Sequence, residues 1–178
     1  EGARFLTENG AACIAIPCNT AHFWHGDIER SVDIPILHIV DAVSEQAKLT
    51  LPDGGRLGIL GTSGTIAAKV YQNRLRDSQF ECLVPTPAEL DQLIMPAIAL
   101  VKAGHVADAG GLLKAAGDLL LARGADRIVM ACTEIPPAMS AYQSDRSCRL
   151  IDATEALAAH CIRWWQSAGK TGRTPQPL

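Results

Sequence analysis

The chain has 178 residues, of which 48% are hydrophobic and 20% are charged, and its formal net charge is −3 at pH 7. These totals are typical of a globular protein of one large or two small domains. With no basic stripe and an aromatic content of 4%, we expect no nucleic-acid partner. No apolar run reaches the roughly 18 residues of a membrane span, so we expect no membrane partner either.

Six cysteines are present, without CxxC spacing and without a histidine pair at ligand spacing. This pattern argues against a zinc site and favours reduced thiols over a disulfide framework. The opening residues, EGARFLTENG, lack the charged and apolar regions of a signal peptide. We therefore expect a cytoplasmic protein with no bound metal.

Residues 3–11 are typical of the end of a helix that Gly10 closes. After it, strand-like runs alternate with helical patterns, which is typical of βαβ units and a mostly parallel sheet. The predicted strands lie near residues 12–17, 35–39, 57–61, 80–84, 127–131 and 148–151. The clearest predicted helices cover residues 41–50, 64–77, 87–103, 106–123 and 152–167.

An internal repeat links two of these strands. ENGAACIAIPCNT at residues 8–20 aligns without gaps with ARGADRIVMACTE at residues 122–134, an offset of 114. Each copy ends its strand on a cysteine. Downstream, the tetrapeptide at 39–42 (IVDA) resembles that at 150–153 (LIDA), at a slightly shorter spacing.

The repeat predicts an α/β fold of two pseudo-symmetric domains, each an open, mostly parallel sheet flanked by helices, with the active site between them. The turn-rich segment LPDGG at 51–55 is the best internal boundary. We expect residues 1–52 with 152–178 to form the first domain and residues 53–151 the second.

Cys18 and Cys132 differ from the other four cysteines because small polar residues and an acid follow them. Those residues suit the start of a helix, and a helix N-terminus lowers a thiol pKa from ~8.5 toward neutrality. We therefore expect two reactive thiols at the carboxyl edges of two sheets. The remaining cysteines are expected to be core residues: Cys13, Cys82, Cys148 and Cys161.

Two thiols on opposite faces of a substrate carbon can invert its configuration. One thiolate removes a proton, and the opposite thiol delivers another to the far side. The reverse reaction uses the same groups with their roles exchanged, which identical residues on pseudo-symmetric halves can satisfy. Backbone N–H groups and polar side chains near the helix starts could then stabilise the carbanion.

Four segments resemble signatures of the aspartate/glutamate racemase superfamily, closest to its aspartate racemase branch: PCNTAH (17–22), SVDIPILHIVDA (31–42), LGTSGT (60–65) and ACTEIP (131–136). The resemblance implies a bacterial, cofactor-independent amino-acid racemase, a homodimer acting on an amino acid such as aspartate. Its acid/base pair would be Cys18 and Cys132. The implied substrate-binding residues are Asn19, Thr20, Thr65, Thr133 and Glu134.

Several alternatives stay open at this stage. Maleate cis-trans isomerisation and hydantoin racemisation belong to the same superfamily, and a non-catalytic α/β domain would need no reactive thiol. The five polar candidates could be helix caps or turn residues, and the histidines could be structural. Candidates for a second carboxylate are Lys69, Arg74 and Arg76. The resemblance also predicts that the first domain lacks an N-terminal strand–helix unit.

Overall fold

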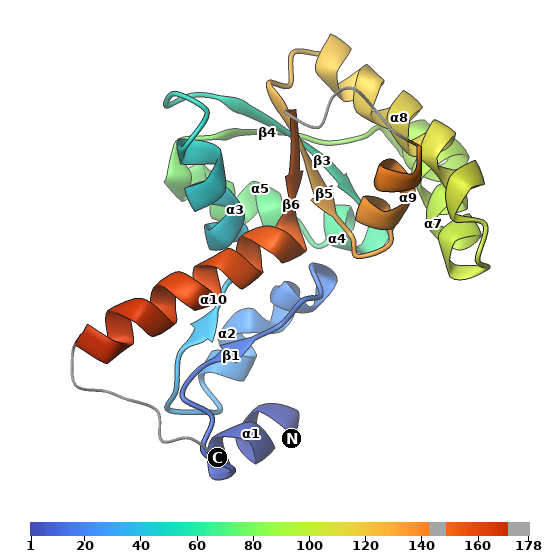
Figure 1. The fold of residues 1–178 in the computed structure, drawn as a ribbon. Coiled ribbons are helices and arrows are strands. Elements are labelled where there is room, and N and C mark those ends of the chain that lie inside the picture. The colour runs from blue at the N-terminus through green and yellow to red at the C-terminus, as the bar shows by residue number, and fades with distance from the viewer. Residues whose placement is uncertain (143–148, 171–178) are drawn as a thin grey trace.

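The computed structural model describes residues 1–142 and 149–170. A larger lobe contains a four-stranded parallel sheet in the order β4-β3-β5-β6, and a smaller lobe contains the parallel pair β1-β2 (Figure 1). The strands are β1 Ile14–Ala15, β2 Ile36–Leu37, β3 Arg56–Gly61, β4 Glu81–Leu83, β5 Arg127–Ala131 and β6 Leu150–Asp152. The predicted α/β class with parallel sheets is therefore confirmed.

Helices surround both sheets. In the smaller lobe they are α1 Gly2–Glu8, the 3-10 helix η1 Thr20–Trp24 and α2 His25–Glu29. In the rest of the chain they are α3 Ile39–Lys48, α4 Ser63–Ala67, α5 Val70–Leu75, η2 Arg76–Ser78, α6 Pro87–Glu89, the π-helix η3 Leu90–Ile94, α7 Met95–Lys102, α8 Val106–Ala122, α9 Ile135–Ala141 and α10 Ala153–Lys170.

Each of the five clearest predicted helices is present, but two of them are interrupted. The helix expected over 64–77 breaks at Lys69, whose φ of 53° is left-handed and separates α4 from α5. The helix expected over 87–103 contains the π-helical turn η3 between α6 and α7. In the smaller lobe, the two predicted strands shrink to two residues each, and η1 and α2 were not among the predicted helices.

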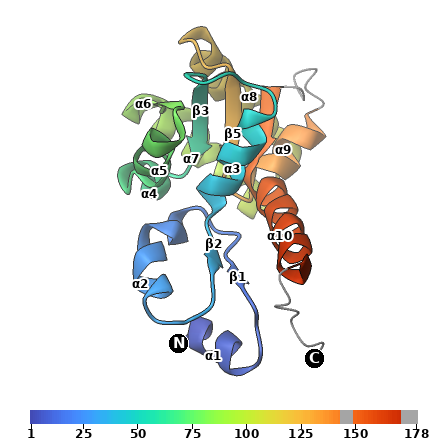
Figure 2. The same ribbon diagram turned by 90° about the vertical axis from the view of Figure 1, so that its left-hand side faces the viewer.

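The larger sheet is buried on both faces because apolar side chains of its strands point alternately to one face and to the other. Leu57, Ile59 and Val129 point into a core with α3, α5 and α10, whereas Leu60 and Ile128 point into a second core with α7, α8 and α9. Burial on both faces explains why these strands are continuous apolar runs in the sequence. Figure 2 shows the helices on both sides of this sheet.

The structure corrects the alignment of the internal repeat. Ile14 pairs with Ile36 in the smaller lobe and Ile128 pairs with Leu150 in the larger one, so the offset of 114 continues through the second strand of each pair. The equivalent positions are therefore 36–39 and 150–153, and the sequence-based match of 39–42 with 150–153 was three residues out of register. The predicted domain boundaries stay a prediction.

Gly110 of α8 provides a sharp test of the helix packing around α9. A Cβ at Gly110 would lie 2.4 Å from Tyr142 Cβ and 2.8 Å from Ala138 O, whereas one at the adjacent Gly111 would meet nothing nearer than 3.8 Å. Gly110→Ala should lower the free energy of unfolding by about 1–3 kcal/mol. Gly111→Ala should raise it by about 0.5–1 kcal/mol, because alanine favours helix. Urea denaturation of both variants checks this, and equal effects would contradict the packing described.

Candidate active site

Cys132 follows β5 at the point where the strand order of the larger sheet reverses. β4 lies on one side of β3, and the chain then crosses to add β5 on the other side. Gly61 pairs with Ala131 at the ends of β3 and β5, so Thr62 and Cys132 follow at the same carboxyl edge. Such a switch point is where ligands bind in open α/β sheets.

The Cys18 segment, residues 16–20, follows β1 and is tied to the larger lobe by its two polar neighbours. Tyr71 donates a hydrogen bond from its buried hydroxyl to Asn19 Oδ1 at 2.6 Å. The Thr20 hydroxyl lies 2.7 Å from the buried Thr65 hydroxyl and 3.3 Å from that of Thr62. The CNT motif and the LGTSGT motif therefore contact each other directly, although 42–45 residues separate their threonines.

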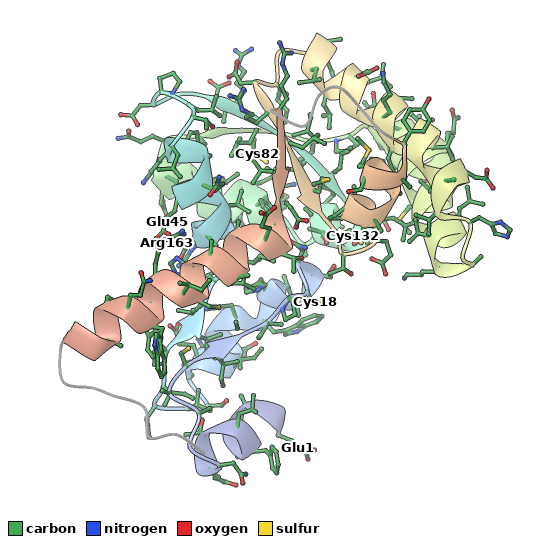
Figure 3. The ribbon with its side chains drawn as sticks, in the orientation of Figure 1. Glu1, Cys18, Glu45, Cys82, Cys132 and Arg163 are labelled. Atoms are coloured by element: carbon green, nitrogen blue, oxygen red, sulfur yellow. The ribbon has the colours of Figure 1, made fainter. Side chains whose placement is uncertain are left out.

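Figure 3 shows Cys18 on the side of the smaller lobe that faces the larger lobe, and Cys132 on the facing edge of the larger lobe. Cys18 is exposed and Cys132 is partly buried. The two thiols thus come from equivalent positions of the repeat and from different lobes. Cys13, Cys82 and Cys161 are also partly buried, while Cys148 lies outside the described residues.

Cys132 is held as a protonated thiol. Its Sγ donates a hydrogen bond to Glu134 Oε2 at 2.8 Å, and the Thr133 hydroxyl donates to the same oxygen at 3.1 Å. Burial, and second the Glu134 carboxylate, raise the pKa of Cys132 to about 12. The hydrogen bond from Cys132 in turn holds the pKa of Glu134 below its ordinary value. For Cys132, the predicted lowering of the thiol pKa was therefore wrong.

Burial is the main cause of that error, and the second cause is the direction in which the polar neighbours point. A helix does begin shortly after each cysteine, η1 at Thr20 and α9 at Ile135. Within the part of the chain that the structure describes, however, neither Asn19 nor Glu134 caps its helix through its side chain. Glu134 turns to the thiol instead, and a carboxylate beside a thiol opposes ionisation.

Lys102 is a cation that the sequence interpretation did not single out. Its Nζ lies 3.8 Å from Glu134 Oε1, at the end of α7. Among the sequence-based candidates, Arg74 donates two hydrogen bonds to Asp41, at 2.7 and 2.6 Å, and Lys69 is exposed beside the break between α4 and α5. No local motif surrounds Lys102, so only the packing of α7 beside α9 could have identified it.

Asn19 has hydrogen-bonding capacity left over. Its side chain is 4% exposed, and its Nδ2 has no hydrogen-bond partner among the described residues. A buried amide donor without a partner is costly, and a ligand acceptor would satisfy it. The described residues contain no group of His, Cys, Asp and Glu arranged to hold a metal ion, and none of their helices is long and apolar enough to cross a membrane.

Comparison with known proteins gives one consistent result. The profile of the Asp/Glu/Hydantoin racemase family matches residues 1–161. The chain belongs to this family. The broad specificity amino-acid racemase RacX of Bacillus subtilis is 30% identical over 163 residues, which cover 91% of this chain and 68% of RacX.

Solved racemase structures match the fold. A crystal structure of an aspartate racemase homologue from Pyrococcus horikoshii has 26% identity and a TM-score of 0.77, covering 91% of this chain and 70% of that one. The aspartate racemase of Picrophilus torridus has 26% identity and a TM-score of 0.72, covering 94% and 67%. Membership in the racemase family places the chain among the isomerases.

The Glu134 carboxylate can be tested through the Cys132 thiol. Glu134→Gln removes the negative charge but keeps a hydrogen-bond acceptor, so the pKa of Cys132 should fall by about one unit. Alkylation of the Cys132 peptide at neutral pH, followed by mass spectrometry, should then be about tenfold faster. The Cys82 peptide is an internal control, because burial alone raises the pKa of that thiol. An unchanged Cys132 rate would contradict the assigned interaction.

Proposed function

We propose that this chain provides the acid/base site of an amino-acid racemase that acts on an acidic substrate such as aspartate, without a cofactor. Cys18 and Cys132 would act on opposite faces of the α-carbon. The single observation that carries the proposal is that two equivalent cysteines of the repeat, one from each lobe, face each other across the site. The homodimer implied by the sequence resemblance stays a prediction.

In the proposed mechanism, the thiolate of Cys18 removes the α-proton from one enantiomer. Cys132, held as a thiol by its hydrogen bond to Glu134, donates a proton to the other face. In the reverse direction, Cys132 must lose its proton and Cys18 must supply one. A proton transfer of this kind typically contributes about 10²–10⁴-fold to the rate.

Asn19 and Thr133 are the proposed ligands of the α-carboxylate. The unpartnered Nδ2 of Asn19 supports this assignment because it offers a donor next to Cys18. Thr133 is exposed next to Cys132, and its hydroxyl would turn from Glu134 to the substrate. Thr20 and Thr65 already share a hydrogen bond of 2.7 Å. We assign them to the same site as the pair that fixes the Cys18 segment, with Thr20 the nearer to substrate. Glu134 controls the protonation of Cys132.

Lys102 is the proposed partner of the second carboxylate. It stands 3.8 Å from Glu134, so its ammonium group lies one side chain away from the Cys132 thiol. A four-carbon dicarboxylate would place its distal carboxylate within reach of such a cation. The relatives are consistent with this substrate class: one is an aspartate racemase, and RacX is described as having broad specificity.

The cysteine pair is tested by α-proton exchange in D₂O with L- and D-aspartate, followed by NMR and optical rotation. Cys18→Ser and Cys132→Ser should each lower racemisation by about 10²–10⁴-fold. Each single variant should still exchange the α-proton of one enantiomer, and the two variants should keep opposite enantiomers. Cys161→Ser, a partly buried thiol on α10, is the control and should keep full activity. Full racemisation in both single variants would reject the two-base assignment.

The substrate class is tested through Lys102. Lys102→Gln should raise KM for aspartate by about 10- to 100-fold, because one hydrogen bond to a charged group is lost. It should lower kcat/KM for alanine much less, because alanine has no second carboxylate. Lys69→Gln serves as the matched control because Lys69 is also an exposed lysine of the larger lobe. Equal losses for aspartate and alanine would show that Lys102 does not recognise the second carboxylate.

A further inference from the structure

Three histidines form a buried cluster in the smaller lobe, directly behind the Cys18 segment. The ring centroid of His38 lies 4.5 Å from that of His22 and 4.6 Å from that of His25. The His22 and His25 centroids are 5.9 Å apart. Each residue is more than nine-tenths buried. The residues come from η1, from α2 and from the residue just before α3, so the cluster joins three elements.

Hydrogen bonds to the backbone fix the tautomer of all three rings. His22 Nε2 donates to Ile16 O at 3.0 Å, and His25 Nε2 donates to Ile36 O at 2.9 Å. His38 Nδ1 accepts from Val40 N–H at 3.1 Å, so its own proton must be on Nε2. Each neutral imidazole therefore carries its proton on Nε2.

The hydrogen bond of His22 connects the cluster to the segment that carries Cys18. Ile16 is two residues before Cys18, and His22 is four residues after it, so this bond closes a short loop around the thiol. Tyr71 and Thr65 hold the next two residues from the other lobe. The Cys18 segment is thus held by a histidine on one side and by hydroxyl groups on the other.

A second proton on the ring of His38 or His22 would have no favourable hydrogen-bond partner. On His38 it would replace the acceptor of the Val40 N–H by a donor. On His22 it would sit at Nδ1, which is buried without a hydrogen-bond partner among the described residues. A buried donor left unpaired, and more so a buried charge, is costly.

The charged groups around the cluster do not remove that cost. Arg74 on α5 repels a cation on His22 or His38, and the attraction from Asp41 on α3 is shared with Arg74 through two hydrogen bonds. Glu29 on α2 stands 3.9 Å from His25 Nδ1 and is exposed, and His160 on α10 faces Asp41. Burial, ahead of these charges, lowers the pKa of both His22 and His38.

We propose that the cluster of His22, His25 and His38 is the positioning device of the Cys18 segment and holds it only while the rings of His22 and His38 are neutral. The role of Cys18 as a base comes from the proposed function, but the cluster and its response to acid do not depend on it. When the segment opens, the rings of His22 and His38 meet water and regain the ordinary imidazole pKa of ~6.5. The state with the segment open then binds more protons than the state with it closed. The closed state therefore has its full stability above about pH 6.5, and this stability decreases as the pH falls below that value.

The internal repeat supplies the conservative substitutions. His38 occupies the position equivalent to Asp152, whose Oδ1 accepts from Thr154 N–H at 2.8 Å just as His38 Nδ1 accepts from Val40 N–H. His38→Asn therefore keeps the acceptor, and His22→Gln keeps an N–H donor for Ile16 O. The double variant H22Q/H38N preserves both hydrogen bonds but removes the two titratable imidazole rings. His105→Gln, at an exposed histidine before α8, is the matched control.

Amide hydrogen exchange measured by mass spectrometry tests the proposal without requiring turnover. Exchange is compared at about pH 7.5 and pH 5.5, corrected for intrinsic rates, in peptides 14–24 and 127–135. In the wild type and in H105Q, exchange of peptide 14–24 should rise by about 10- to 100-fold at the lower pH, because each of the two rings contributes up to about tenfold, while peptide 127–135 stays constant. In H22Q/H38N the rise should disappear.

Two results would overturn the proposal: a wild-type peptide 14–24 that does not respond to pH, or an equal response in H22Q/H38N. His22→Leu, which removes the donor to Ile16 O, should raise exchange of this peptide at both pH values. If that variant does not fold, the double variant still decides. Because no step requires racemisation, loss of the proposed activity and failure of the cluster give separate results.

Discussion

The hydrogen bonds that carry the Cys18 segment onto the larger lobe are the constraint on which the site depends. Tyr71 to Asn19 and Thr65 to Thr20 are short bonds between buried or partly buried groups of different lobes. Each is worth only about 1 kcal/mol in net stability. Their importance is geometric, because Cys132 is fixed by the larger sheet whereas Cys18 follows a strand of two residues. Without them, nothing in that short strand would relate one thiol to the other.

The repeat explains how one chain presents two equivalent thiols. Gly10 and Gly124 both take a left-handed φ, 85° and 97°. Each lies in the turn between a helix and the strand that leads to a cysteine. Glycine adopts this conformation without the cost that a side chain adds. The strand that pairs with each cysteine strand then leads to a residue whose side chain accepts a hydrogen bond from the following helix, His38 in one half and Asp152 in the other. The same backbone device thus holds a titratable imidazole in one lobe and a carboxylate in the other.

Much of this could be predicted from the sequence because apolar runs buried on both faces leave a strong pattern. The strands of the larger sheet and the helices around it agree with that pattern. Thr20 and Thr65, which the family resemblance assigned to one site, contact each other, but no apolar pattern predicted this contact. What the pattern could not predict depends on side-chain direction. Glu134 was expected to favour a helix start, yet it bonds Cys132, and burial together with this carboxylate raises that thiol's pKa instead of lowering it. Lys102 reaches the site only through the packing of α7, which no spacing in the sequence encodes.

The two thiols are unequal before any substrate binds, and this constrains the proposed mechanism. A racemase must run in both directions through the same pair, yet Cys132 is partly buried beside a carboxylate while Cys18 is exposed. A substrate brings an ammonium group and carboxylates into the site. An ammonium group near Glu134 would offset the charge that helps keep Cys132 protonated. In the proposed mechanism, the substrate's own charge would thus ease the ionisation of Cys132, so that a thiol held protonated in the free protein could also act as a base.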